Sequence, residues 1–322
     1  MNKLTDKEGI DLLVKKYAEL NQEIHKVIVG QDHVIREVII SVLSRGHSLL
    51  VGVPGLAKTL LIKTIADSLG LSFKRIQFTP DLMPSDIVGS EILDENRSFR
   101  FIKGPLFANI ILADEINRTP PKTQAALLEA MQEKTVTAAG TRYPLPEPFF
   151  VLATQNPIEQ EGTYPLPEAQ LDRFMFNVWV DYPEFNEELA IVKATTSDIE
   201  VKLNHILSAE EILYFQGLIR RIPVPEAVYE YAVKLVAKTR QTGPYVHELS
   251  KQYIDWGAGP RASQFLVIGA KCNAAISGKY TPDIEDVVKV ALPILRHRIV
   301  RNYRAEAEGF TTEKILAELM KG

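Results

Sequence analysis

The sequence has one cysteine, Cys272, in 322 residues. A disulfide within the chain and a zinc site built from cysteines are therefore both excluded. The sequence also lacks an apolar run near the length that crosses a membrane, about 20 residues. Its first residues (MNKLTDKE) are polar and lead into a helical pattern, unlike a signal peptide. The sequence therefore predicts a cytoplasmic protein that is not inserted in a membrane.

A strong excess of charge of either sign is also missing. There are 37 Lys and Arg against 41 Asp and Glu, which gives a net charge of −4. No separate basic module is evident, so nucleic acid is not an expected partner, although a ring of acidic subunits can still line a channel with positive charge. The length is enough for about two domains, each with its own core.

A phosphate-loop pattern stands between a predicted strand and a predicted helix. The apolar run 48–51 precedes GVPGLAKT at 52–59, and a helical pattern continues from residue 60. Small residues in such a loop let backbone N–H groups surround a polyphosphate, and the helix adds the positive end of its dipole. Lys58 would reach the outer phosphates, and the Thr59 hydroxyl would hold Mg²⁺. The alternative is a simple strand-to-helix turn with a chance Lys–Thr pair.

One position of this loop departs from the pattern G-x-x-x-x-G-K-[ST]. Ala57 stands where the second glycine is expected, and we expect Gly55 to supply the flexibility instead. The residues predicted to contact ATP or ADP in this region are Gly52, Val53, Pro54, Gly55, Leu56, Ala57, Lys58, Thr59 and Leu60. The apolar segment before the loop is either a helix–helix connection or a wall for the adenine ring, formed by Ile28, Val29 and Gly30.

Two acidic residues follow the apolar run 109–113, which predicts a buried parallel strand. Ligands bind at the carboxyl edge of such sheets. Asp114 can hold Mg²⁺, directly or through water, and Glu115 can polarise a water molecule for attack on the γ-phosphate. The strand at 149–154 ends before Asn156, whose amide would lie beside Glu115 if the two strands are neighbours. An asparagine before proline is otherwise a common turn.

The remaining pattern predicts a two-domain organisation. Residues 1–183 alternate strands and helices, with hairpin insertions between 90 and 103, turning at 94–96, and between 134 and 144. Residues 184–322 read as helices only, including one that opens at 281–283 and runs towards Val300. Arg261 falls on the first turn of one of these helices, and Arg173 precedes the last core strand. Arg261 is explained as a solvated charge or as a residue that folds back onto a nucleotide between the domains, and Arg173 as a surface cation or a helix-end salt bridge.

The ordered set of these motifs resembles the AAA+ ATPases, and within them the MoxR-like branch. Four stretches carry the resemblance over almost the whole chain: 52–59, 113–118 (ADEINR), 153–157 (ATQNP) and 162–174 (GTYPLPEAQLDRF). Alanine at position 57 is typical of this branch. The resemblance implies an α/β P-loop core with a five-stranded parallel sheet and hairpin insertions, followed by a smaller all-helical lid domain.

The resemblance also implies roles for individual residues. Lys58 would clamp the phosphates, Thr59 and Asp114 would bind Mg²⁺, and Glu115 would be the catalytic base. Asn156 would act as sensor 1 and Arg261 as sensor 2. Arg173 would be an arginine finger that acts on the neighbouring subunit, with Arg118 as the alternative for that role.

The function implied by the resemblance is an ATPase that remodels, matures or assembles a protein complex. The protein would form a homo-oligomeric ring, with a hexamer as the expectation, and would work with a partner that carries a von Willebrand factor A domain. The alternatives are a DNA-acting AAA+ motor of the helicase or clamp-loader type and a magnesium-chelatase-type motor subunit. DNA-stimulated ATPase activity would favour the former, and co-purification with a porphyrin-binding partner the latter.

Overall fold

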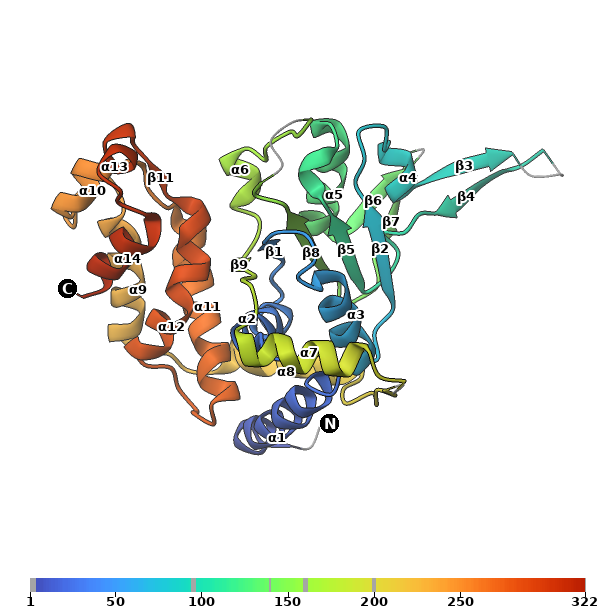
Figure 1. The fold of residues 1–322 in the computed structure, drawn as a ribbon, viewed down its shortest axis with the longest axis horizontal. Helices are drawn as coiled ribbons and strands as arrows, with labels where there is room; N and C mark the ends of the chain where they lie inside the picture. Colours follow the sequence, from blue (N-terminus) through green and yellow to red (C-terminus); the bar gives the residue numbers. More distant parts are fainter. Residues whose placement is uncertain (1–3, 94–96, 139, 159–161, 199–200, 322) are drawn as a thin grey trace.

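The computed structural model describes residues 4–93, 97–138, 140–158, 162–198 and 201–321. Figure 1 shows a central α/β region, a helical region at its left and a pair of strands that extends to the right. In the ranges just given, no helix is both long enough and apolar enough to cross a membrane.

The central region is built on a parallel sheet with the strand order β2-β5-β8-β1-β9. Its strands are β1 (Ser48–Val51), β2 (Phe73–Gln77), β5 (Ile110–Asp114), β8 (Phe150–Gln155) and β9 (Phe176–Trp179). The register pairs Gln77 with Asp114 and Val51 with Gln155, so these strands end along one edge. The predicted five-stranded parallel sheet is confirmed.

Helices cover both faces of the sheet because successive strand side chains alternate between the faces. Ile110 and Leu112 belong to the core on the side of α1, α2 and α3, whereas Ile111 and Ala113 face α5. All four side chains are fully buried, which explains why β5 is a continuous apolar run. The helical segments of this region are α1 (Asp6–Ile24), α2 (Asp32–Leu43), α3 (Lys58–Ser68), α4 (Pro84–Val88), η1 (Ile116–Arg118), α5 (Pro121–Glu133) and α6 (Glu168–Leu171).

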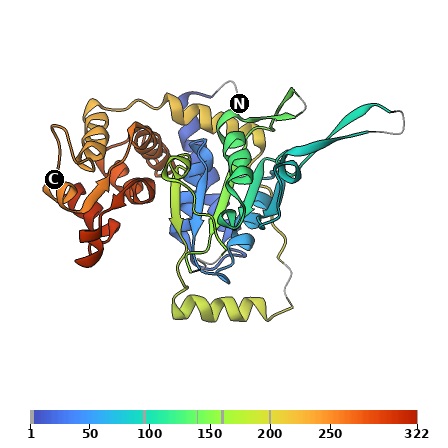
Figure 2. The same cartoon turned by 90° about the horizontal axis from the view of Figure 1, so that it is seen from above.

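Antiparallel hairpins interrupt the α/β order at both predicted places. The strands are β3 (Gly89–Leu93) with β4 (Phe99–Lys103), and β6 (Thr135–Ala138) with β7 (Thr141–Pro144). The predicted turn at 94–96 lies outside the described residues. Phe101 of β4 stacks on Tyr143 of β7 with ring centroids 4.3 Å apart, so the hairpins contact each other near their bases. Figures 1 and 2 show the β3–β4 hairpin extending far from the sheet.

The C-terminal part of the chain is helical, as predicted. Its helices are α7 (Phe185–Thr195), α8 (Ala209–Arg221), α9 (Glu226–Lys238), α10 (Glu248–Tyr253), α11 (Pro260–Ile276), α12 (Ile284–Leu295), α13 (Tyr303–Ala307) and α14 (Thr312–Met320). Helices α9, α11 and α12 pack together, and both α8 and α11 also pack on α1 and α2 of the central region. Figure 2 shows α7 apart from the other helices. The boundary between residues 183 and 184 stays a prediction.

Two details of this helical part differ from the prediction. Helix α12 ends at Leu295 and not near Val300, and the chain turns through a short 3-10 helix, η2 (Arg296–Arg298). Strand β11 (Val300–Arg301) then pairs antiparallel with β10 (Ile254–Trp256), so the domain is not helical throughout. Strands this short are too small to show an alternating pattern in the sequence.

Candidate active site

A cavity of about 390 Å³ lies at the carboxyl edge of the sheet. It collects predicted residues from the loop after β1, the end of β5 and the end of β8. Its lining consists of Pro54, Gly55, Leu56, Ala57, Lys58, Thr59, Arg75, Asp114, Glu115, Thr154 and Asn156. The neighbouring positions of β5 and β8 explain why the acidic pair and the asparagine meet there.

The loop after β1 has the backbone that a phosphate cradle needs. A Cβ atom at Gly52 would lie 2.6 Å from the carbonyl oxygen of Val180, so only glycine fits where β9 passes. Gly55 has a φ of +89°, and Ala57 also has a left-handed backbone, with a φ of 53°. Ala57 thus takes the conformation that glycine adopts freely and that costs an alanine free energy. The expectation that Gly55 supplies the flexibility in place of Ala57 is therefore incomplete, because both residues bend the loop.

Lys58, the first residue of α3, points its side chain back across this loop. Its ammonium donates a hydrogen bond to the carbonyl oxygen of Gly52. Burial lowers the pKa of Lys58, and the negative charges of Asp114 and Glu115 oppose that shift. The lysine is therefore directed at the place where phosphates would meet the loop.

Asp114 is held at both carboxylate oxygens by neighbouring strands. The Thr154 hydroxyl of β8 donates to Oδ1 at 2.6 Å. Arg75 of β2 donates to Oδ2 through Nε at 3.0 Å and through Nη2 at 2.6 Å. These contacts fix the carboxylate in the cavity, beside Lys58 and Thr59.

Glu115 has a left-handed backbone, with a φ of 56°, and its amide donates to the Thr154 hydroxyl at 2.8 Å. Its Oε2 accepts from Nε2 of Gln77 at 2.8 Å and from Nη1 of Arg118 at 3.2 Å. Arg75 in turn donates to Oε1 of Gln77 at 2.6 Å. The two acidic residues are thus joined through one network that runs along β2.

Asn156 lies just beyond β8 and is buried, with 7% of its surface exposed. Its Oδ1 accepts from the backbone amide of Ile158 at 3.1 Å, which is an Asx turn. The turn alternative is therefore present, and the same residue also lines the cavity, so the two interpretations are compatible.

Six predicted contact residues from the loop and from the segment 28–30 are not among the residues that line the cavity. Ile28, Val29 and Gly30 precede Gln31, whose amide nitrogen reaches the carbonyl of Asp181 at 3.5 Å near the end of β9. A Cβ atom at Gly30 would meet the Glu187 carboxylate of α7. Gly52 and Val53 precede the lining segment 54–59, and Leu60 follows it.

The arginines assigned to the sensor and finger roles lie outside the cavity as well. Arg261, on the first turn of α11, pairs with Asp172 at 3.1 Å. Arg298 of η2 pairs with the same carboxylate at 2.8 Å, and burial lowers its pKa to about 10. Arg173 is half-buried, and among the residues that the structure describes its guanidinium has no hydrogen-bond or ion-pair partner.

Comparisons with known proteins place this geometry in a family. The model of the ATPase family associated with various cellular activities (AAA) matches residues 47–176, and that of the AAA lid domain matches residues 246–319. Chaperone MoxR1 of Mycobacterium tuberculosis is 42% identical over 316 residues, which cover 98% of this chain and 83% of that protein. The chain belongs to the MoxR-like AAA+ ATPases.

Two other proteins also align with most of this MoxR-like chain. Protein MoxR of Methylorubrum extorquens is 30% identical over 301 residues, which cover 88% of this chain and 87% of that one. A crystal structure of a Cytophaga hutchinsonii protein has a TM-score of 0.91 and 44% identity, and covers 98% of this chain and 96% of that one. The predicted AAA+ core, helical lid and ATPase activity are therefore confirmed, and a chaperone-like role fits.

The site of this MoxR-like ATPase has donors that suit Mg²⁺ bound with a nucleotide. Thr59 and Asp114, which both line the cavity, offer hard oxygen ligands. In the described part of the chain, no group of three or more His, Cys, Asp or Glu side chains could hold a metal. A Mg²⁺ ion commonly takes one or two protein ligands, with phosphates and water completing its shell, so this donor set fits.

Three residues of the network were not predicted from the sequence: Arg75, Gln77 and Thr154. Arg75 and Gln77 share one face of β2, and the register places Gln77 beside Asp114. One sequence feature could have indicated Arg75, because it is a charged residue within a strand pattern. Its role depends on the position of β2 next to β5, and the local pattern carries no information on strand order.

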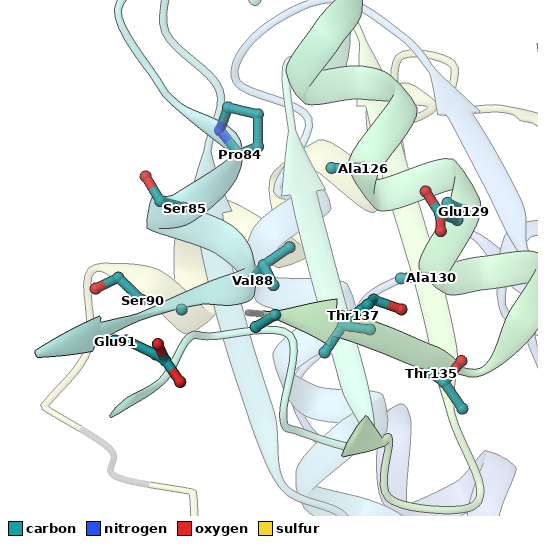
Figure 3. A pocket seen from close by; sticks show the side chains of 13 residues that line it. Pro84, Ser85, Val88, Ser90, Glu91, Ala126, Glu129, Ala130, Thr135 and Thr137 are labelled. Atoms are coloured by element: carbon teal, nitrogen blue, oxygen red, sulfur yellow. The ribbon is translucent and has the colours of Figure 1, made fainter. Parts of the chain in front are cut away.

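A second cavity, of about 420 Å³, lies between α4, α5 and the hairpin strands β3 and β6 (Figure 3). Hydroxyl groups of Ser85, Ser90 and Thr137 and the carboxylates of Glu91 and Glu129 line it. It shares no lining residue with the cavity at the carboxyl edge of the sheet. The hairpins thus meet the core at a groove with both polar and apolar lining residues, separate from the first cavity.

Proposed function

We propose that this MoxR-like ATPase uses Mg²⁺-dependent ATP hydrolysis to remodel, mature or assemble a protein complex. The observation that carries the proposal is the single cavity in which Lys58, Asp114, Glu115 and Asn156 meet the loop after β1. Those groups supply a cation for the phosphates, a metal ligand, a base and a polar amide. They are the parts that phosphoryl transfer to water requires.

Each side chain has a separate task in this proposal. Lys58 binds the outer phosphates, and Thr59 with Asp114 holds the metal ion, which neutralises charge that develops on the phosphate oxygens. Glu115 orients a water molecule and takes its proton, with Gln77 and Arg118 fixing one of its oxygens. The Asn156 amide binds the same water or the γ-phosphate.

The ring is a further part of the proposal, with six subunits as the expected number. Arg173 is favoured over Arg118 as the finger, because Arg118 is engaged with Glu115 of its own subunit. Arg261 would act as sensor 2 after leaving Asp172. Ile28, Val29 and Gly30 would face the adenine ring.

A protein client is favoured by the β3–β4 hairpin, which exposes Ile92, Leu93, Phe99 and Ile102. Apolar side chains on a protruding hairpin suit contact with another protein better than contact with DNA. The name of the Mycobacterium tuberculosis relative, a chaperone, supports the same class. A partner with a von Willebrand factor A domain and a cytoplasmic location stay predictions, and the DNA-motor and magnesium-chelatase alternatives are not favoured.

The test replaces Glu115 by glutamine. Glu115→Gln keeps the size of the side chain but removes its charge and the base, so turnover should fall about 10²-fold or more. ATP affinity should change by no more than about threefold, because Glu115 makes no contact with phosphate in this proposal. Binding is measured by calorimetry and turnover by phosphate release.

Lys58→Ala is the contrasting variant. It removes a positive charge from the phosphates and should weaken ATP binding itself. Equal losses of binding and turnover in Glu115→Gln would contradict the base assignment. Mixed with cell proteins in the presence of ATP, the Glu115→Gln protein should retain its client.

A further inference from the structure

Among the described residues that line the proposed nucleotide cavity, Arg75 is the cation that donates hydrogen bonds to the proposed metal ligand, Asp114. Its Nε and Nη2 both donate to Oδ2 of Asp114, at 3.0 and 2.6 Å. The Asp114 side chain is 13% exposed, whereas that of Arg75 is 48% exposed. The arginine therefore has room to move, and the aspartate does not.

The contacts of Asp114 leave little capacity for a metal ion. Each carboxylate oxygen has two lone pairs. Arg75 uses both at Oδ2, and the Thr154 hydroxyl uses one at Oδ1. A divalent cation would also have to approach within a few ångströms of a guanidinium. Arg75 and Mg²⁺ therefore compete for the same carboxylate.

The place to which Arg75 can move is also set by the fold. The residue sits inside β2, two positions before the strand end, and its side chain lines the cavity together with Thr59 and Asn156. A guanidinium released from Asp114 thus stays within the cavity. Its planar fork matches the oxygens of a phosphate as well as those of a carboxylate. The terminal phosphate of ATP is the anion that ATP brings and ADP lacks.

We propose that Arg75 is a positioning residue that exchanges Asp114 for the terminal phosphate of ATP when the metal ion binds. The inference rests on the proposed ATP site and adds a residue to it. Because Arg75 also donates to Gln77, the exchange alters the hydrogen bonds of the side chain that holds Glu115. Arg75 thereby links the metal ligand, the terminal phosphate and the base.

The experiment measures binding and not turnover. Wild type, Arg75→Gln and Lys74→Gln are titrated with ADP and with the non-hydrolysable analogue AMP-PNP, over a series of Mg²⁺ concentrations that starts in EDTA. Mg²⁺ is expected to strengthen ADP binding, and the midpoint is the Mg²⁺ concentration that gives half of this effect. In Arg75→Gln the midpoint should fall about tenfold, since the guanidinium that competes with Mg²⁺ for Asp114 is gone. The preference for AMP-PNP over ADP should also fall about tenfold, since the terminal phosphate loses a charged partner.

Lys74→Gln is the matched control, because Lys74 is an exposed neighbour on the same strand and carries the same charge. It should change neither quantity. If Arg75→Gln does not fold, Arg75→Lys, which keeps the charge without the fork, should shift both quantities in the same directions by a smaller factor.

The proposal requires both shifts. An unchanged Mg²⁺ midpoint with ADP, or equal weakening of ADP and AMP-PNP, would overturn it, since a merely structural arginine gives that result. A wild-type protein that binds neither nucleotide would instead overturn the proposed ATP site, so the two failures are distinguishable.

Discussion

Two non-glycine residues of the site, Ala57 and Glu115, have a left-handed backbone. Such a conformation costs an L-residue about 1–2 kcal/mol, and residues of this kind gather at active sites. At Ala57 it turns the chain into α3, whose first residues, Lys58 and Thr59, line the cavity. At Glu115 it turns the chain out of β5 and into η1.

Ala57→Gly should stabilise the fold by about 1 kcal/mol. Glycine has no Cβ to clash at a φ of 53°, and it is also preferred to alanine as the residue before a helix. Urea denaturation measures the gain. Ala125→Gly, at an exposed position inside α5, is the control, because there the same change should cost about 1 kcal/mol.

Loss of stability in Ala57→Gly would show that the alanine methyl group makes a contact worth more than the backbone strain. ATP affinity should change little, because the backbone path is already the one that glycine prefers. The two glycine variants should therefore shift the denaturation midpoint in opposite directions.

Some side chains of the site are predicted from the sequence, and others are not. Lys58 and Thr59 were predicted because the whole loop motif is local, and Asp114 because it ends an apolar run. Arg75 and Thr154 were not predicted, because their contacts with Asp114 join strands far apart in the chain. The local sequence pattern specifies which side chains each strand carries, and the strand order decides which of these side chains come into contact.

At the scale of elements, the sheet and both hairpins follow from patterns that the sequence shows clearly. Long apolar runs predict buried strands, and alternation around turn residues predicts hairpins. The end of α12 at Leu295 was not predicted, because the pattern stays helical there. Arg298 leaves the helix to donate hydrogen bonds to the carbonyls of Asp172 and Phe174, and those contacts are tertiary.

The β3–β4 hairpin offers a matched pair of aromatic residues. Phe101 stacks on Tyr143 at 4.3 Å and also contacts Phe107, whereas Phe99 is 75% exposed. Phe101→Ala should destabilise the protein by about 1–2 kcal/mol, through lost apolar burial and a lost aromatic pair. Phe99→Ala should stay within about 0.5 kcal/mol of wild type, as exposed positions do.

Urea denaturation of both variants measures the difference, with ATP affinity as a check on the core. Equal costs would mean that the two rings are buried alike, against the stacking geometry. A loss of client retention in Phe99→Ala without a loss of stability would place the client on the hairpin.

At the scale of the molecule, Asp172 joins the central region to the helical domain. It accepts from Arg261 of α11 and from the buried Arg298 of η2. The next residue along the chain is Arg173, whose guanidinium has no hydrogen-bond or ion-pair partner in the described ranges. A change in the helical domain that moves these two arginines would therefore also move Arg173.

This placement supports the proposal that Arg173 completes the site of a neighbouring subunit. It does not line the nucleotide cavity of its own chain, so ATP binding to one subunit should not need it. An arginine directed at the γ-phosphate stabilises charge that grows in the transition state, and such fingers contribute about 10³–10⁵ in rate. Arg173→Ala should therefore bind ATP and hydrolyse it poorly. In wild type, specific activity should rise with protein concentration as rings form.

The decisive measurement mixes two inactive proteins, Glu115→Gln and Arg173→Ala. In a mixed ring, some interfaces join an intact Glu115 of one subunit to an intact Arg173 of the next, so part of the ATPase activity should return. Arg118→Ala mixed with Glu115→Gln is the comparison. Because Arg118 binds Glu115 within its own subunit at 3.2 Å, that mixture should gain no such interface activity. If mixed rings form and only the Arg118→Ala mixture recovers, the finger is Arg118, and Arg173 serves its own subunit.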